Sequence, residues 1–213
     1  ERRISVADIA RRYGVFVIED EVYKPILEEQ LPSMPELLPE LGFFVTSFTK
    51  TVMTGLRTGY LVVPAHYSIR VTSILRVTSW SGVNLVAEMA SRWVEDGTAS
   101  QLLDIQRSEL RLRQALVSDI LGSHVAGSNP LSLCAWLQIP RNWSEDGLVR
   151  ALANKGVAVT PSEPFIAGGD RKNGGIRICL GGRLSRSSLQ IALETIRETF
   201  AQLPPVYDVS SIA

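Results

Sequence analysis

The string SFTKTVMTGLRTGY (47–60), together with a short acidic segment upstream, carries the groups best suited to chemistry. Lys50 supplies an amine that can form an imine, and Arg57 supplies a fixed planar cation that suits a phosphate. Asp20 supplies a carboxylate at the end of an apolar run, and Tyr23 supplies a phenol three residues later. An aldehyde with a phosphate and a ring nitrogen would use all four groups, and pyridoxal phosphate is such a molecule.

Each group has a separate task in such a site. A carboxylate beside the ring nitrogen keeps it protonated, because an opposite charge at contact distance shifts a pKa by about 1–3 units. Asp20 is the candidate for this task, and Tyr23 is the candidate donor to the ring oxygen. The hydroxyls of Ser47 and Thr49 flank the lysine and suit the phosphate, together with the arginine.

Taken singly, each residue has a plainer explanation. Asp20 lies between Glu19 and Glu21 and fits an acidic loop. A lysine such as Lys50 is usually a surface residue, and Arg57 could pair with any acid. The order and spacing of the whole set are much harder to produce by chance, so we favour the cofactor site.

Short apolar runs predict the strands that position these groups. Residues 15–18 form a continuous run rich in branched side chains, which predicts a strand buried on both faces, as in a parallel sheet. The runs 43–45 and 59–64 predict two more strands. In α/β sheets, ligands bind at the carboxyl ends of the strands, where Asp20 and Lys50 are expected to lie.

The remainder of the chain predicts helices followed by a smaller unit. Apolar residues at helical spacing predict two long helices within 65–121, ended by Gly97 and Gly122. Three arginines on the second helix alternate with acids, so we interpret them as a solvated face: Arg107, Arg111 and Arg113. After residue 122 the order β–α–β–β–α predicts a compact α+β unit.

The resulting fold class is α/β, in three parts. Residues 1–65 are predicted to be the C-terminal part of a large-domain sheet, 66–121 the connecting helices, and 122–213 a small α+β domain. The glycine-rich string GGDRKNGG (168–175) lies between two predicted strands and opens no helix. We interpret it as a mobile turn rather than a phosphate loop.

Charge and composition exclude several functions for this chain by itself. Basic and acidic residues number 22 each, so the net charge is zero, and no long run of one sign occurs. This balance disfavours binding to nucleic acid or to an anionic membrane. No apolar stretch approaches the roughly 20 residues of a membrane span, and the N-terminus has no signal-peptide core.

Cys134 and Cys179 both lie among apolar neighbours, which is typical of buried thiols in a reducing compartment. The sequence leaves a disulfide between them open. With no sign of secretion, we expect a cytoplasmic protein. The chain starts inside a helical pattern without a methionine, so we expect part of a longer protein upstream.

The motifs resemble the C-terminal half of a class I/II aminotransferase of fold type I. In that family Asp-x-x-Tyr follows one strand, Ser-x-x-Lys follows the next, and Gly-Leu-Arg-x-Gly-Tyr comes shortly after. The resemblance implies pyridoxal phosphate as cofactor, with Asp20 on the ring nitrogen and Tyr23 on the ring oxygen. It also implies Lys50 as the imine-forming proton carrier, and Ser47 and Arg57 on the phosphate.

The resemblance extends to the C-terminal part of the chain. The string IRICLG (176–181) is similar to the family strand whose arginine binds the substrate carboxylate, which makes Arg177 the candidate. GVAVTPSEPF (156–165) is similar to the strand and turn before it. The family's N-terminal half supplies other parts of the cofactor cradle, so this chain alone is expected to bind pyridoxal phosphate weakly or not at all.

Three interpretations of the chain fit these motifs, and two of them concern the parent protein. The wording VIEDEVY is similar to MocR-type regulators of the GntR family, in which a DNA-binding domain precedes an aminotransferase-like domain that senses pyridoxal phosphate or an amine. The alternative parent is a free cytosolic aminotransferase acting on an amino acid and a 2-oxo acid. A third interpretation is a core fragment without activity of its own. We favour the regulator, and by the same resemblance we expect a homodimer.

Overall fold

The computed structural model describes residues 1–203 except 30, 81–83, 128 and 168–173. The chain divides into two compact units, Glu1–Arg107 and Ser108–Ala213, which we describe separately. The three-part domain division remains a prediction. Most of the glycine-rich string 168–175 lies outside the described residues, so its interpretation as a mobile turn remains a prediction too.

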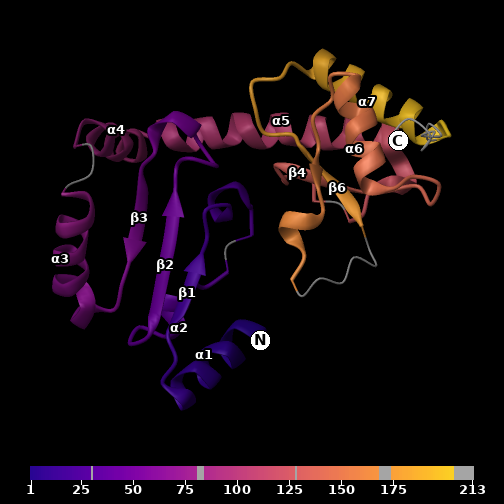
Figure 1. The fold of residues 1–213 in the computed structure, drawn as a ribbon. Helices are drawn as coiled ribbons and strands as arrows, with labels where there is room; N and C mark the ends of the chain where they lie inside the picture. Colours follow the sequence, from indigo (N-terminus) through magenta and orange to yellow (C-terminus); the bar gives the residue numbers. More distant parts are fainter. Residues whose placement is uncertain (30, 81–83, 128, 168–173, 204–213) are drawn as a thin grey trace. The chain divides into compact units, whose positions relative to one another are not determined.

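The first unit contains a three-stranded sheet with the order β1-β2-β3 (Figure 1). β1 (Val17–Asp20) is parallel to β2 (Gly42–Ser47), and β3 (Gly59–Val62) is antiparallel to β2. The strands lie at or near the predicted runs. The helical elements are α1 (Arg2–Tyr13), η1 (Lys24–Ile26), α2 (Met34–Leu37), η2 (Thr54–Leu56), η3 (Ala65–Tyr67), α3 (Ser68–Ser79), α4 (Asn84–Glu95) and the start of α5 (Thr98–Leu121).

α1 and α2 pack beside one face of this sheet. Ala7 and Ala10 of α1 form a small buried cluster with Leu38, against which Val17 of β1 packs. The first helix ends at Gly14, which adopts the left-handed conformation (φ 61°) that glycine tolerates best. This face of the sheet is therefore covered by elements close to it in sequence.

The opposite face of the sheet is largely exposed, so the prediction of strands buried on both sides is wrong for this chain. Ile18 is 71% exposed, and Leu61 of β3, which lies on the same face, is 44% exposed. Tyr67 packs edge-on against Phe16 at one end of this face. An apolar run reports a strand's capacity for burial, whereas its exposure depends on which other elements pack there.

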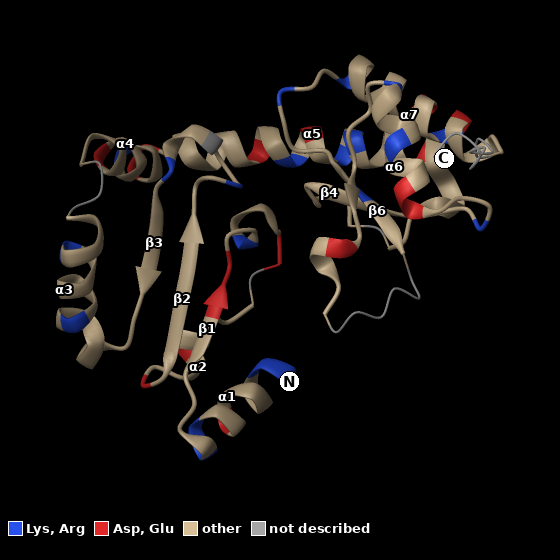
Figure 2. Cartoon of the chain, viewed as in Figure 1, with Lys and Arg blue, Asp and Glu red and all other residues tan. Residues whose placement is uncertain are grey.

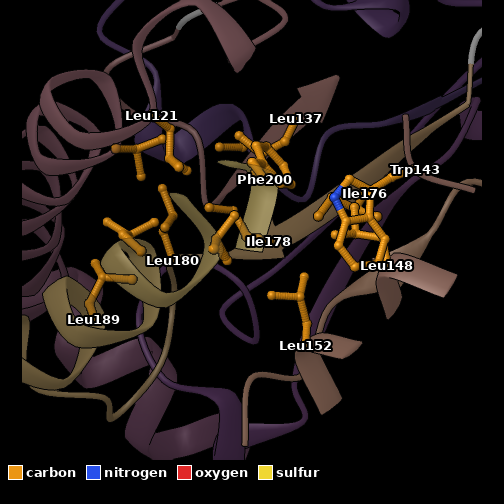
Figure 3. Packing of buried hydrophobic residues seen from close by; sticks show 14 residues of the cluster. Leu121, Leu137, Trp143, Leu148, Leu152, Ile176, Ile178, Leu180, Leu189 and Phe200 are labelled. Carbon is orange, nitrogen blue, oxygen red and sulfur yellow. The ribbon is translucent and has the colours of Figure 1, made fainter. Parts of the chain in front are cut away.

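The second unit contains the antiparallel sheet β4-β6-β5 and two helices, of which one lies between β4 and β5 in the chain and the other follows β6. Its elements follow the C-terminal part of α5: η4 (Gly122–His124), β4 (Cys134–Gln138), α6 (Glu145–Asn154), β5 (Thr160–Pro161), η5 (Glu163–Phe165), β6 (Gly175–Cys179) and α7 (Arg186–Ala201). The predicted order β–α–β–β–α is present. Leu137, Ile176, Leu148 and Leu152 form part of its apolar core (Figure 3).

Two arginines of α5 are structural rather than solvated, which corrects their interpretation from the sequence. Arg113 is 7% exposed and donates hydrogen bonds to the carbonyls of Leu180 and Leu184 at 2.6 and 2.7 Å. Arg107 donates to main-chain carbonyls near η1. The alternating acids suggested a surface stripe, but an arginine's long stem lets its charged end reach carbonyls of other segments.

Among the described residues, no helix has both the length and the apolar character needed to span a membrane.

Replacing Arg113 with methionine tests its structural role. The change keeps a long apolar stem but removes the donors to the Leu180 and Leu184 carbonyls, so we expect a loss of about 2–4 kcal/mol in unfolding free energy. The matched control is Arg197→Met on α7, where the arginine is exposed. Denaturant unfolding of both variants measures the difference, and equal stability would show that the bonds of Arg113 contribute nothing.

Candidate cofactor site and carboxylate site

The register of the first sheet brings predicted cofactor residues to one edge. Asp20 at the end of β1 pairs with Val45 on the parallel β2, and Ser47 ends β2 two residues later. Gly59 begins β3 and pairs with Ser47, so Arg57, two positions earlier, lies in the segment entering at the same edge. Because side chains alternate along a strand, Asp20 and Ser47 face the same side of the sheet.

Asp20 lies between two acidic neighbours at the end of β1, the red strand in Figure 2, and strand alternation points its side chain away from theirs. Glu19 and Glu21 both form ion pairs with Arg3 of α1. Asp20 points to the opposite face, where it is exposed and its Oδ1 accepts a hydrogen bond from the Val22 amide at 3.2 Å. Asp20 therefore belongs to the strand, not to a common acidic loop.

Tyr23 lies just before η1 and is about half exposed (49%). Arg107 fixes the backbone that follows Tyr23, because its guanidinium donates to the carbonyls of Pro25 and Ile26 at 2.8 and 2.9 Å. A phenol on a braced turn can hold a constant position relative to the strand end.

Lys50 lies in the turn after β2 and is exposed. The turn is anchored by Phe48, which is 8% exposed and belongs to a buried cluster with Leu56. The Phe48 carbonyl accepts from the Val52 amide at 2.9 Å, and the Thr51 hydroxyl donates to the Ser47 carbonyl at 3.1 Å. The turn thus has a fixed backbone, while the lysine side chain that it carries remains accessible.

Arg57 adopts a left-handed backbone conformation, with φ 49° and ψ 29°. For a residue with a Cβ this conformation costs about 1–2 kcal/mol, and such strain is found most often at functional sites. The Arg57 side chain is exposed, and the predicted hydroxyl residues Ser47 and Thr49 are half-buried. One cation and two hydroxyls suit an anion such as a phosphate.

Arg177 occupies the centre of the second unit's sheet, and we describe its surroundings by themselves. It pairs with Trp136 of β4 on one side and Thr160 of β5 on the other. Its guanidinium carbon lies 4.9 Å from the Phe165 ring centroid, and its Nη2 lies 3.5 Å from the Thr160 hydroxyl oxygen. The Trp136 and Phe165 rings meet edge to face at 5.6 Å.

The Nε of Arg177 is buried and has no hydrogen-bond partner among the described residues. An unsatisfied buried donor costs about 1–3 kcal/mol, so a ligand that supplies an acceptor is favoured there. A carboxylate fits this requirement because it accepts paired N–H bonds from a guanidinium.

Reasoning from sequence missed the residues around Arg177 and the anchor of the lysine turn. These are Trp136, Thr160 and Phe165 in the second unit, and Phe48 in the first. Phe48 is an apolar residue among polar ones in the motif, and this pattern could have predicted that its side chain is buried. Trp136 and Thr160 become neighbours of Arg177 through strand pairing, and Phe165 through η5 after β5, and the sequence reveals neither arrangement.

Gly175 allows the indole of Trp136 to lie against β6. An added Cβ at Gly175 would come within 2.3 Å of the indole Nε1, so we expect Gly175→Ala to displace the ring. The expected cost is about 1–3 kcal/mol in stability. Gly182→Ala is the control, because a Cβ there meets no atom within 4 Å. Unfolding and tryptophan fluorescence measure both effects, and identical behaviour of the two variants would contradict the packing role.

Comparison with known proteins identifies relatives of two kinds. The uncharacterized HTH-type transcriptional regulator YdeF of Bacillus subtilis is 25% identical over 203 residues, which is 95% of this chain and 44% of the regulator. The 2-aminoadipate transaminase of Thermus thermophilus is 25% identical over 170 residues, which is 75% of this chain and 43% of the enzyme. The chain thus spans less than half the length of both relatives.

The fold has a close counterpart among solved structures. LysN, the α-aminoadipate aminotransferase of Thermus thermophilus, was solved in complex with N-(5'-phosphopyridoxyl)-L-leucine. It matches with a TM-score of 0.78 and 21% identity over 93% of this chain and 53% of LysN. This likeness confirms the expected fold class, a partial α/β fold of the aminotransferase type.

The family model for class I and II aminotransferases matches residues 4–196, which is most of the chain. The resemblance seen in the motifs is therefore confirmed. The chain belongs to the class I and II aminotransferase family.

Proposed function

We propose that this chain is the C-terminal portion of a pyridoxal-phosphate-binding, aminotransferase-like effector domain, in a transcription regulator with a DNA-binding domain upstream. The cofactor proposal is carried by the register that places Asp20, Ser47 and the Arg57 segment at one edge of the first sheet. The regulator proposal is supported by similarity to an HTH-type regulator over 95% of the chain.

The residues at this edge fit the chemical groups of the cofactor. Arg57, Ser47 and Thr49 supply a cation and two hydroxyls for the phosphate. The Asp20 carboxylate faces the same side as Ser47 and suits a protonated ring nitrogen, and the Tyr23 phenol suits the ring oxygen. Together they match an anion at one end of the molecule and a cation at the other.

Lys50 is the proposed covalent anchor and proton carrier. When bound, pyridoxal phosphate supplies an aldehyde that links to an amine and a protonated ring that withdraws electrons. The exposed Lys50 amine would hold that aldehyde, and as a free amine it could take up and return a proton as general base and acid. The fixed backbone of its turn restricts the positions that the amine can reach.

The proposed ligand is an amino acid or a related amine. Arg177 favours a ligand with a carboxylate, because its buried Nε has no acceptor among the described residues. Trp136 and Phe165 would then border the part of the ligand next to that carboxylate.

A free cytosolic aminotransferase is the alternative parent, and the similarity to the 2-aminoadipate transaminase favours it. In either case we propose a cytoplasmic homodimer. The isolated chain is expected to hold the cofactor weakly or not at all, since it contributes only part of the cradle.

Covalent labelling tests the role of Lys50. After incubation of the full-length protein with pyridoxal phosphate and reduction with borohydride, we expect the pyridoxyl group on the Lys50 peptide, and none in Lys50→Ala. Lys24→Ala is the control from the same unit, since the Lys24 ammonium already binds the Leu31 carbonyl at 2.9 Å. A pyridoxyl group distributed over other lysines, or unchanged in Lys50→Ala, would refute the assignment.

Two substitutions at Arg57 distinguish the effect of its charge on cofactor affinity from the effect of its backbone conformation on stability. Arg57→Gly and Arg57→Ala both remove the cation, so cofactor affinity should fall about tenfold to a hundredfold in each. Glycine tolerates the left-handed conformation (φ 49°), so Arg57→Gly should be about 1 kcal/mol more stable than Arg57→Ala. Cofactor titration measures the affinity, and unfolding measures the stability. If Arg57→Gly binds the cofactor as tightly as the wild type does, the cation is not used.

The two parents differ in what the full-length protein does. A regulator binds specific DNA upstream of its targets, with affinity that changes on adding pyridoxal phosphate or an amine ligand. A free enzyme turns over an amino acid with a 2-oxo acid repeatedly and lacks such DNA binding. Footprinting and a coupled transamination assay on the same preparation distinguish them, and rapid turnover without DNA binding would refute the regulator.

A further inference from the structure

The chain's two cysteines lie directly opposite each other on neighbouring antiparallel strands. Cys134 begins β4, Cys179 ends β6, and the register pairs the two residues. In the adjoining pair, the Leu180 amide donates to the Leu133 carbonyl at 2.7 Å, which marks a hydrogen-bonded pair. Because the two kinds of pair alternate along an antiparallel ladder, Cys134 and Cys179 form a non-hydrogen-bonded pair.

A non-hydrogen-bonded pair brings the two cysteines close enough to be joined. Its Cα atoms are about 4.5 Å apart, within the range of about 4.4–6.8 Å found across disulfides. Neither cysteine is in a disulfide here, and Cys179 is exposed while Cys134 is half-buried. The expectation that both thiols are buried is therefore wrong. Their neighbours Ala135 and Ile178 are buried, so the cysteines face away from the core that these residues enter.

We propose that Cys134 and Cys179 form a reversible cross-strand disulfide, which makes this end of the β4–β6 ladder a thiol redox site. The oxidant is a peroxide. The exposed Cys179 thiolate attacks a peroxide oxygen, the O–O bond breaks, and the released hydroxide takes a proton to become water. Cys179 is then a sulfenic acid.

The Cys134 thiolate completes the reaction by attacking the Cys179 sulfur. The S–S bond forms, the S–O bond breaks, and the departing hydroxide takes a proton as a second water. Overall, two thiols are oxidised by two electrons and one peroxide is reduced. A dithiol reductant restores both thiols by exchange through a mixed disulfide.

The disulfide would lie beside the row that contains Arg177. Trp136 and Arg177 pair directly, two positions from Cys134 and Cys179, and alternation places all four side chains on one face. Disulfides hold their Cβ atoms about 3.8 Å apart, whereas directly opposite Cβ atoms are usually about 4.5–5.5 Å apart. Oxidation therefore draws the Cβ atoms on this face closer together next to this row and crowds Trp136 against Arg177. The effect of this disulfide on ligand binding rests on the proposed role of Arg177 in binding the ligand's carboxylate.

Peptide mapping of the full-length protein tests bond formation without any cofactor or ligand. The reduced protein is treated with hydrogen peroxide, alkylated and digested without reductant. We expect a cross-linked peptide pair joining Cys134 to Cys179, which disappears with dithiothreitol. Both residues recovered as alkylated thiols, or Cys179 joined only to another molecule or oxidised to sulfinic acid, would overturn the proposal.

Single variants assign the order of attack. Cys134→Ser should leave Cys179 as a sulfenic acid that a cyclic diketone traps, because no second thiol faces it. Cys179→Ser should leave Cys134 as an unreacted thiol. The reverse pattern would overturn the assignment of Cys179 as the attacking residue.

Chemical labelling of Arg177 tests whether the disulfide changes the packing of the neighbouring Trp136–Arg177 pair. We expect phenylglyoxal to modify Arg177 several-fold more slowly in the oxidised protein than in the reduced one. The double variant Cys134→Ser/Cys179→Ser should show equal rates with and without peroxide. Equal rates in the oxidised and reduced wild type would overturn the coupling, whereas a failure of the proposed ligand role would leave the results of all three experiments unaffected.

Discussion

The parallel pairing of β1 with β2 is the constraint on which the first unit's candidate site depends. Asp20 and Val45 lie side by side, so the strands end together and Ser47 follows on the face of Asp20. A slip of one residue would turn Asp20 to the face of Glu19. Glu19 is tied to that face by Arg3 and by the Met34 amide, which donates to it at 2.8 Å. The contacts of Glu19 thus help to keep Asp20 on the opposite face of the strand.

The second unit shows how environment gives two arginines different tasks. Arg113 is buried and has carbonyl acceptors at Leu180 and Leu184, so its charge is used within the fold. Arg177 is half-buried, stacks near Phe165, and keeps a buried Nε without an acceptor among the described residues. A guanidinium whose donors are all used stabilises structure, whereas one with a remaining donor is suited to bind a carboxylate.

The two units also differ in how their sheets are covered. In the second unit, Leu137 and Ile176 are fully buried on the core face of the sheet. In the first unit, Ile18 and the whole of β3 remain exposed, although their composition suits burial. Exposed branched and aromatic side chains on a sheet cost free energy in proportion to their area, so the first sheet gains less from apolar burial than the second.

The sequence by itself determined the local features: the strand and helix order, the stop at Gly14, and the motif residues around Asp20 and Lys50. These depend on residue type and short spacing, which the chain displays directly. Only the tertiary structure decided which residues meet across strands, as Trp136 and Cys134 meet residues of β6 more than 40 positions away. Pairing of this kind follows from competition among distant segments for the same neighbours, and no local pattern records its outcome.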